Sequence, residues 1–325
     1  MYLETGSPMR GAQRRRVQEF LSACGLDWDE GICYTCALIE DDEVIACGSL
    51  DGATIKCVAV SPMHQGEDLA SRILTDLRRE AFERGETHLM LFTKPKNERL
   101  FAPLGFYPVQ RADDVLLMET ERHGLENFVA ALETGRKPGE SAAIVANCNP
   151  ITNGHLHLIR TAAAFCETLH LFILSEEKSE IPAADRIRLV REACAEMKNV
   201  RVHPTGPYMI SSATFPAYFL RDKAKVERAY CDLDIGIFAE KIAPALGITK
   251  RFVGTEPLSR VTDFYNEQLK RRLPEAGIEL IEIPRLTCDG EPVSASRVRA
   301  LWQEGNFEEL RPLVPECVYR YLKGE

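Results

Sequence analysis

The strand-to-helix turn at residues 149–160 carries side chains suited to phosphate chemistry; it reads Asn-Pro-Ile-Thr-Asn-Gly-His-Leu-His-Leu-Ile-Arg. Gly154 permits close approach to the backbone, and a helix that begins near His155 presents its positive end to an anion. The imidazole of His155 and the hydroxyl of Thr152 can donate hydrogen bonds to phosphate oxygens. Nucleotidyl transfer needs little beyond such positioning and charge stabilisation. An ordinary turn with a capping His is the alternative interpretation.

A second candidate motif, Val-Ser-Ala-Ser-Arg-Val-Arg, lies far downstream at residues 293–299. It resembles the Ile-Ser-x-(Thr/Ser)-x-x-Arg signature of the nucleotidyltransferase superfamily. The first turn resembles that superfamily's His-x-Gly-His motif, with Thr152 at the first His position. We expect Ser296 to cap the final helix, and the free N–H groups there to hold the β- and γ-phosphates together with Arg299. A common Ser-capped helix is the alternative, but two such motifs in this order favour nucleotidyl transfer.

Two strand ends between these motifs supply further candidates. Lys178 lies in a polar loop after one predicted strand, where relatives place a phosphate-contacting Lys; a solvated loop charge is the alternative. Gly254 ends another strand at the edge where superfamily members hold adenine and ribose, and Glu256 is a weaker candidate. The residues predicted to bind ATP are Asn149, Pro150, Gly154, Gly254, Thr255, Ser294 and Ser296.

The first half of the chain resembles the GNAT acetyltransferases. A strand leads through Val-Ser-Pro into residues 65–70, Gln-Gly-Glu-Asp-Leu-Ala, at a helix start, and Leu-Gly-Phe follows at 104–106. The family pattern there is (Arg/Gln)-x-x-Gly-x-(Gly/Ala), which holds the pyrophosphate of coenzyme A on backbone N–H groups. Asp68 replaces a Gly, and its carboxylate would repel that ligand. The residues predicted to contact a coenzyme A-like group are Gln65, Gly66 and Ala70.

Hydrophobic periodicity divides the chain at a linker over residues 133–140, which contains two Gly, a Pro and several charges. We predict an α/β protein with a GNAT-like domain at 1–134 and a Rossmann-like, parallel-sheet nucleotidyltransferase domain at 140–325. Strands are predicted at 32–40, 44–50, 54–60, 87–92, 142–146, 169–174, 200–203, 251–253 and 279–283. Helices are predicted at 14–24, 69–84, 125–132, 154–165, 184–197, 239–246, 263–273 and 296–321, with a loop and helical stretch at 209–227 and a separate segment at 232–235.

Composition narrows the classes of function. The chain has 325 residues, is 45% hydrophobic and carries a net charge of −9, which argues against a general nucleic-acid binder. It shows no signal-peptide pattern and no apolar run long enough for a membrane span. Eleven cysteines then indicate reduced thiols and a cytoplasmic protein. The Cys-x-x-Cys at residues 33–36 has no second pair, so strand thiols are favoured over a zinc site.

Nearly the whole chain resembles the citrate lyase ligase family. The resemblance rests on the turn at 149–160, on Ile-Ser-Ser-Ala-Thr-Phe-Pro-Ala-Tyr-Phe-Leu-Arg-Asp at 210–222, on the long string at 252–274, and on 293–299. That family carries Thr at the position of Thr152, as do the phosphopantetheine adenylyltransferases. The resemblance implies that ATP and acetate form acetyl-adenylate, and that the acetyl group passes to the CoA-like prosthetic-group thiol on the acyl-carrier subunit of citrate lyase.

The resemblance also implies site residues and partners. His155, Thr152, Lys178 and Arg299 would be catalytic, with ATP and Mg²⁺ but no bound organic cofactor and no dedicated protein ligands for the metal. Acetate or the carrier would contact Ser211, Ser212 and Thr214. The GNAT half could position the pantetheine thiol. The rival interpretations are a phosphopantetheine-type adenylyltransferase and a regulatory module that binds nucleotide and CoA without turnover.

Overall fold

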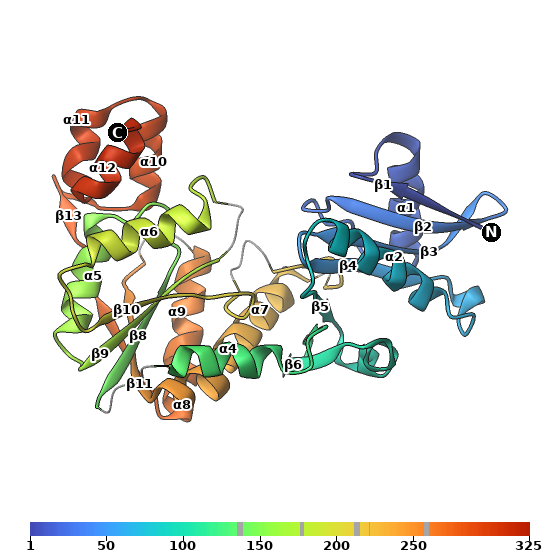
Figure 1. Cartoon of the computed structure of the whole chain (residues 1–325), viewed down its shortest axis with the longest axis horizontal. Helices are drawn as coiled ribbons and strands as arrows, with labels where there is room; N and C mark the ends of the chain where they lie inside the picture. The colour runs from blue at the N-terminus through green and yellow to red at the C-terminus, as the bar shows by residue number, and fades with distance from the viewer. Residues whose placement is uncertain (135–138, 176–178, 211–214, 221, 257–259) are drawn as a thin grey trace. The chain divides into compact units, whose positions relative to one another are not determined.

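The computed structural model describes residues 1–325 except 135–138, 176–178, 211–214, 221 and 257–259 (Figure 1). The chain forms two compact units. Unit 1 consists of Met1–Leu125 and Phe215–Leu233, and unit 2 consists of Glu126–Thr214 and Asp234–Glu325. Each unit has its own cluster of buried apolar side chains. Unit 1 is therefore discontinuous in sequence, because a segment from the second half of the chain completes it.

Unit 1 is built on a seven-stranded sheet in the order β1-β2-β3-β4-β5-β7-β6. Neighbouring strands are antiparallel except for the parallel pair β4 and β5. The strands are β1 Tyr2–Gly6, β2 Tyr34–Glu40, β3 Glu43–Asp51, β4 Thr54–Val60, β5 Met90–Thr93, β6 Tyr107–Arg111 and β7 Leu116–Glu119. Short turns join β2, β3 and β4, whereas the parallel step from β4 to β5 requires the crossover helix α2.

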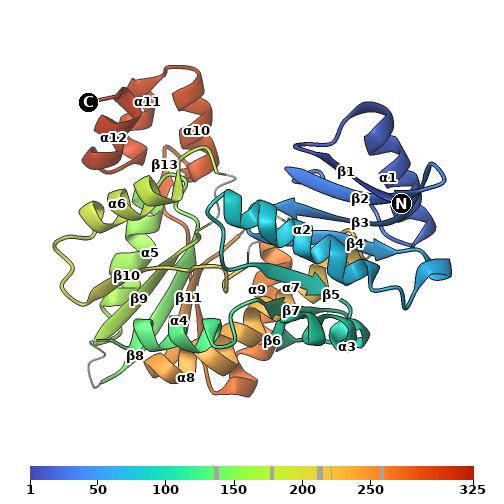
Figure 2. The same ribbon diagram turned by 45° about the vertical axis from the view of Figure 1, so that its right-hand side comes forward.

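The helix α2 packs along β2, β3 and β4, as Figure 2 shows. Its apolar residues recur every three or four positions, and Leu69, Ile73 and Leu77 are almost fully buried. The helices of this unit are α1 Gly11–Ala23, η1 Pro62–His64, α2 Leu69–Glu83, η2 Pro95–Asn97, α3 Glu98–Phe101 and η3 Ala102–Leu104. The predicted helices at 14–24 and 69–84 are confirmed within a few residues.

Strands β6 and β7 were not predicted, and neither was β1. Its sequence, Tyr-Leu-Glu-Thr-Gly, is short and largely exposed, because it forms the edge of the sheet and pairs with β2 alone. An edge strand buries little side-chain surface, so its sequence lacks the apolar alternation that identifies the interior strands.

Unit 2 is built on a five-stranded parallel sheet in the order β10-β9-β8-β11-β12. Its strands are β8 Ser141–Ala146, β9 Thr168–Ile173, β10 Val200–Pro204, β11 Ile248–Gly254 and β12 Glu279–Ile283. The chain first moves from β8 outward to β10 and then returns to the other side of β8, so the order reverses between β8 and β11. In sheets of this kind, ligands bind beyond the carboxyl ends of the strands at that reversal.

Helices join these strands and cover the sheet, as predicted from the strand–helix alternation (Figure 1). They are α4 Gly124–Glu133, α5 Asn153–Ala163, α6 Ala183–Ala193, the π-helical turn η4 Phe238–Ile242, α8 Ala243–Leu246, α9 Arg260–Arg272, η5 Pro274–Ala276, α10 Ala295–Gln303, α11 Phe307–Leu310, η6 Arg311–Leu313 and α12 Glu316–Lys323. The helix α7 Lys223–Ile237 begins in unit 1 and ends in unit 2. A small hairpin, β13 Thr287–Cys288 and β14 Glu291–Pro292, precedes α10. The separate segment predicted at 232–235 is wrong, because those residues continue α7.

Both faces of the central strands are covered. On β9, Leu169, Leu171 and Ile173 join the main apolar cluster, while His170 and Phe172 are buried on the opposite face. Such two-sided burial is typical of a parallel sheet. All eleven cysteines are free thiols, and Cys36 is a buried core residue, as expected. Across the described parts of the chain, no helix combines the length and apolarity that a membrane span requires.

Candidate functional site

The predicted phosphate turn joins β8 to α5 at the reversal of strand order. Thr152 is the N-cap of α5: its hydroxyl oxygen accepts a hydrogen bond from the backbone N–H of His155 at 3.3 Å. In return, the Nδ1 atom of His155 accepts from the backbone N–H of Thr152 at 3.1 Å. The Thr152 hydroxyl also lies 2.9 Å from that Nδ1 atom, and Thr152 is fully buried. This reciprocal capping box fixes the imidazole ring relative to the helix end.

The hydrogen bonds of His155 determine which ring nitrogen can reach a ligand. Because Nδ1 accepts from a backbone N–H, the proton of the neutral ring resides on Nε2. Burial, with a smaller contribution from the positive charge of Arg285, lowers the pKa of His155 to about 4. At neutral pH this side chain is therefore an uncharged donor through Nε2. An exposed His close to a phosphate would instead become a cation, because the negative charge would raise its pKa.

The beginning of the turn is held by two further contacts. The side-chain oxygen of Asn149 accepts from the backbone N–H of Ile181 at 3.1 Å, and Asn149 and Pro150 are both buried. Arg186, at the start of α6, is fully buried and donates to the carbonyls of Ile181 at 3.0 Å and Asn147 at 2.9 Å. These contacts tie the loop after β9 to the loop after β8.

The second motif forms the start of α10, but with a different cap from the one predicted. Ser294 is the N-cap, accepting from the backbone N–H of Arg297 at 3.2 Å. The prediction that Ser296 caps the helix is wrong, because Ser296 lies inside the first turn. Its hydroxyl accepts a 3.4 Å hydrogen bond from Arg299 instead. Nor is α10 the last helix, since α11 and α12 follow it.

Arg299 connects the two motifs. Its Nη1 atom donates to the backbone carbonyl of Asn149 at 2.8 Å, and its Nε atom lies 2.6 Å from a carboxylate oxygen of Glu180. The motifs also touch at Gly154, where a Cβ atom would lie 2.8 Å from the carbonyl oxygen of Val293. Glycine is thus required at this position by the approach of the second motif. Residues about 140 positions apart in sequence form one site.

The end of β11 borders the same site. A Cβ atom added to Gly254 would meet no atom within 4 Å, so the surface there is open. The carbonyl of Gly254 accepts from Asn266 at 3.3 Å, and the N–H of Thr255 donates to Ile283 at 3.0 Å. These groups are thus already paired with protein partners.

Arg285 was not identified from the sequence. It follows β12, donates through Nε to the carbonyl of Thr255 at 2.8 Å, and forms an ion pair with Glu256. It is also the charged group that contributes to the lowered pKa of His155. A charged residue placed just after a predicted strand, at the same edge as the other candidates, is the signal that could have found it. Lys178, Ser211, Ser212 and Thr214 lie outside the described residues.

In unit 1, the predicted coenzyme A turn precedes α2. Asp68 is the N-cap position and adopts a left-handed conformation with φ of 57°, without capping the helix through its side chain. This is the backbone conformation for which glycine is favoured, so a Gly at this position would be unstrained. Gln65, Gly66, Glu67 and Asp68 are exposed, and Ala70 lies in the first turn of α2. Two carboxylates therefore flank the helix end.

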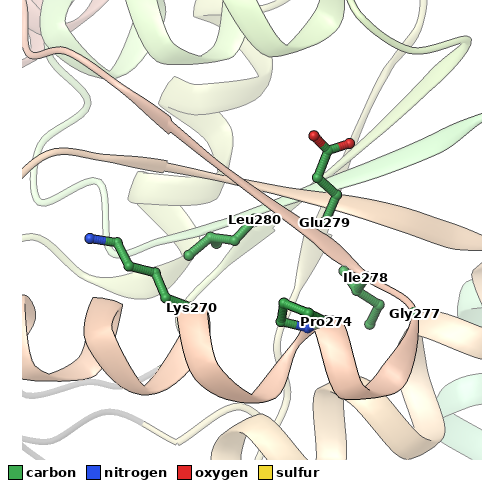
Figure 3. A pocket seen from close by; sticks show the side chains of 6 residues that line it. All are labelled: Lys270, Pro274, Gly277, Ile278, Glu279 and Leu280. Carbon is green, nitrogen blue, oxygen red and sulfur yellow. The ribbon is translucent and has the colours of Figure 1, made fainter.

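A surface depression of about 430 Å³ lies away from these residues (Figure 3). It is lined by Lys270, Pro274, Gly277, Ile278, Glu279 and Leu280. These residues surround the amino end of β12, whereas the phosphate turn follows the carboxyl end of β8. The ammonium of Lys270 is paired with Glu267 and Glu282 at 2.7 and 3.0 Å. We do not assign the depression to the site.

Comparison with known proteins supports both halves of the prediction. Residues 141–322 match the family model for the citrate lyase ligase C-terminal domain, and residues 6–106 match that of the acetyltransferase (GNAT) family. Together with the mixed sheet of unit 1 and the parallel sheet of unit 2, these matches confirm the predicted fold class.

Full-length relatives give the same assignment. The citrate pro-3S-lyase ligase of Escherichia coli (strain K12) is 40% identical over 315 residues, which cover 95% of this chain and 90% of that protein. The protein of the same name from Klebsiella pneumoniae is 39% identical over 317 residues, covering 95% of this chain and 92% of that protein. A phosphopantetheine adenylyltransferase of Shouchella clausii (strain KSM-K16) is 29% identical over 116 residues, covering 34% of this chain and 70% of that protein. The chain belongs to the citrate lyase ligase family.

Proposed function

We propose that this chain activates acetate with ATP and transfers the acetyl group to the thiol of the CoA-like prosthetic group on the acyl-carrier subunit of citrate lyase. Family membership over nearly the whole chain supports the reaction. The main support for the location of the nucleotide site is the contact between the two phosphate motifs. They meet through Arg299 and Gly154, at the reversal of strand order. We also propose residues 1–134 and 140–325 as the two functional modules.

In the first step, an acetate oxygen attacks the α-phosphorus of ATP and pyrophosphate departs, which leaves acetyl-adenylate. In the second step, the carrier thiolate attacks the acetyl carbon and AMP departs. Acetate is ionised at neutral pH, so the first step needs no general base. The protein's task is to bring two anions together and to stabilise the charge on the departing pyrophosphate.

The residues of unit 2 suit that task. His155 donates a neutral hydrogen bond through Nε2 to a phosphate oxygen, and the positive end of the α5 dipole adds to it. Arg299 supplies a guanidinium at the start of α10, where its contacts with the Asn149 carbonyl and the Glu180 carboxylate fix its position; a phosphate would compete with Glu180 for its charge. Thr152 acts as a positioning residue, because its hydroxyl is engaged with the helix end and with His155.

The nucleotide would extend from this turn toward β11. The open surface at Gly254 and the neighbouring Thr255 would accommodate the adenosine, while Ser294 and Ser296 lie beside Arg299 for the phosphates. A phosphate contact from Lys178, and an acetate or carrier contact from Ser211, Ser212 and Thr214, remain predictions from sequence.

We propose Mg²⁺ as the counter-ion of the nucleotide. In the described portion of the chain, no group of three His, Cys, Asp or Glu side chains is arranged to hold a metal ion. Mg²⁺ commonly binds through substrate phosphates and keeps most of its water. The donors at the site, the Nε2–H of a neutral imidazole whose Nδ1 is already hydrogen-bonded to Thr152 and a guanidinium, suit phosphate oxygens.

The test is ATP–pyrophosphate exchange with and without acetate. Acetate-dependent exchange supports the proposal, whereas exchange that depends on phosphopantetheine would indicate an adenylyltransferase. Absence of exchange would indicate a binding module. His155→Ala should lower the exchange rate at least ~100-fold, the scale for losing a key transition-state donor. His157→Ala, on the same helix, is the matched control and should change little. A loss below about threefold in His155→Ala contradicts its assigned role.

A further inference from the structure

The two parallel strands of unit 1 part from each other. β4 and β5 pair at two positions, Thr54 with Met90 and Ile55 with Leu91. Beyond Ile55, the backbone of β4 is displaced by a bulge, and Cys57 adopts a left-handed conformation with φ of 54°. The carboxyl-terminal parts of the strands are therefore not joined by ladder hydrogen bonds, and the sheet opens between them.

Residues from the second half of the chain fill this opening. The hydroxyl of Tyr218 donates to the backbone carbonyl of Phe92 on β5 at 3.1 Å, and the ring of Phe215 packs edge-on against that of Phe92 at 5.7 Å. The carbonyl of Tyr218 accepts from the backbone N–H of Asp27 at 2.8 Å. Tyr218 and Phe215 are each 7% exposed. Both the backbone and the side chain of this segment are thus integrated into unit 1.

The contacts of Tyr218 satisfy groups that the parted strands leave without a ladder partner. A buried backbone carbonyl requires a hydrogen-bond donor, and for Phe92 the phenol supplies it. Burial, together with the nearby Cys57 and Asp29, raises the pKa of Tyr218 well above its usual value, so the phenol stays protonated and remains a donor. The segment therefore fills the gap between the parted strands with side chains of the same unit.

The opening lies next to the predicted coenzyme A turn. β4 leads directly through η1 into residues 65–70, and α2 then returns the chain to β5. In a β–α–β unit, ligands bind beyond the carboxyl ends of the strands. A pyrophosphate at this turn would send its attached arm into the opening between β4 and β5. The turn itself carries the exposed carboxylates of Glu67 and Asp68, which disfavour an anion.

We infer that Tyr218 and Phe215 are internal occupants of the acyl-binding opening of unit 1, so that this unit accepts no coenzyme A thioester and acetyl groups enter the reaction through unit 2 alone. The acetyltransferase fold here serves as a frame that holds residues 215–233. This goes beyond the proposed function, which concerns the chemistry of unit 2. Binding to unit 1 can be measured without ATP, so its outcome is independent of the exchange assay.

The experiment is isothermal titration of the full chain with acetyl-CoA and with dephospho-CoA. Wild type and Asp68→Gly should show no saturable binding up to about 1 mM. Combining Asp68→Gly with Tyr218→Ala removes one of the two carboxylates and one of the two occupants, and should give saturable binding with a Kd of about 0.1 mM or tighter, at least roughly tenfold below the limit for Asp68→Gly alone. Tyr107→Ala combined with Asp68→Gly is the matched control, because it removes an exposed tyrosine of the same unit outside the opening.

Saturable binding by the wild type overturns the inference, as does a folded double variant that binds no better than Asp68→Gly. If that variant does not fold, hydrogen exchange of the wild type decides. The amides of residues 218–220 should then exchange as slowly as those of β5, and acetyl-CoA should change neither. The inference is overturned if the amides of residues 218–220 exchange fast while those of β5 are protected. It is also overturned if acetyl-CoA speeds the exchange of residues 218–220.

Discussion

Thr152→Val tests whether the residue at the first His position of the motif acts on the nucleotide or on His155. The change preserves side-chain volume but removes the hydroxyl that caps α5 and lies 2.9 Å from Nδ1 of His155. Loss of an N-cap costs about 1 kcal/mol and at most about 2 kcal/mol. The bond from the Thr152 backbone N–H to Nδ1 is retained. The ring therefore loses one of two contacts, worth about 1 kcal/mol, or roughly fivefold in rate.

The assay is thermal unfolding and ATP–pyrophosphate exchange on the same protein samples. In a domain of roughly 150–250 residues, the size class of unit 2, a loss of 1 kcal/mol lowers Tm by about 2–4 °C. Thr152→Ser keeps the oxygen and is the control, with near wild-type values expected. If Thr152→Val lost about 100-fold in exchange at unchanged Tm, the hydroxyl would contact the nucleotide directly, and the positioning role would be refuted.

Three further predictions concern the contact between the motifs and the response to acid. Gly154→Ala should lower the free energy of unfolding by about 1–3 kcal/mol in urea, because the added Cβ would lie 2.8 Å from a carbonyl oxygen; unchanged stability would contradict the packing. Arg299→Lys keeps the charge but loses the planar donor set, so exchange should fall about tenfold, and wild-type exchange would show that charge alone suffices. Burial lowers the pKa of both His155 and His203 to about 4, so as pH falls the unfolded chain takes up protons at these histidines before the folded chain does. The free energy of unfolding should therefore fall between pH 6.5 and 4 by about 3 kcal/mol per histidine, and it should be constant above pH 7. Thermal unfolding against pH measures this, with His203→Gln expected to remove its share of the slope.

Much of the fold was predictable because most interior strands and the amphipathic helices carry strong local patterns, although the short buried strand β7 was missed. The errors occurred where local pattern and tertiary context disagree. β1 is a polar edge strand and shows no alternation. Gly236 and its β-branched neighbours disfavour a helix locally, yet they continue α7 to Ile237 because that segment is buried. The placement of residues 215–233 in unit 1 depends on contacts with Phe92 and Asp27, which no local pattern encodes.

The candidate site shows the same division. The residue types at 149–160 and 293–299 indicated phosphate chemistry, and the structure brings them into contact. Ser294 and Ser296 are equally good caps by type, and the structure selects Ser294, the residue at which the extended chain passes into α10. The neutral state of His155 depends on burial and on Arg285, which approaches from the end of another strand. Such a pKa shift arises from the tertiary structure and is not visible in the motif.

The discontinuity of unit 1 has a consequence for how the chain is made. Translation delivers Met1–Leu125 first, but Phe215–Leu233 emerges only after about 90 more residues, or about 5–20 s of synthesis at ordinary rates. During that interval, the nascent sheet has a carbonyl at Phe92 without its phenol donor and an apolar opening without its aromatic occupants. Unit 1 therefore cannot finish folding during synthesis before residues 215–233 have emerged. Its completion awaits a segment of unit 1 that is encoded between the two parts of unit 2, so synthesis of the first part of unit 2 precedes the completion of unit 1.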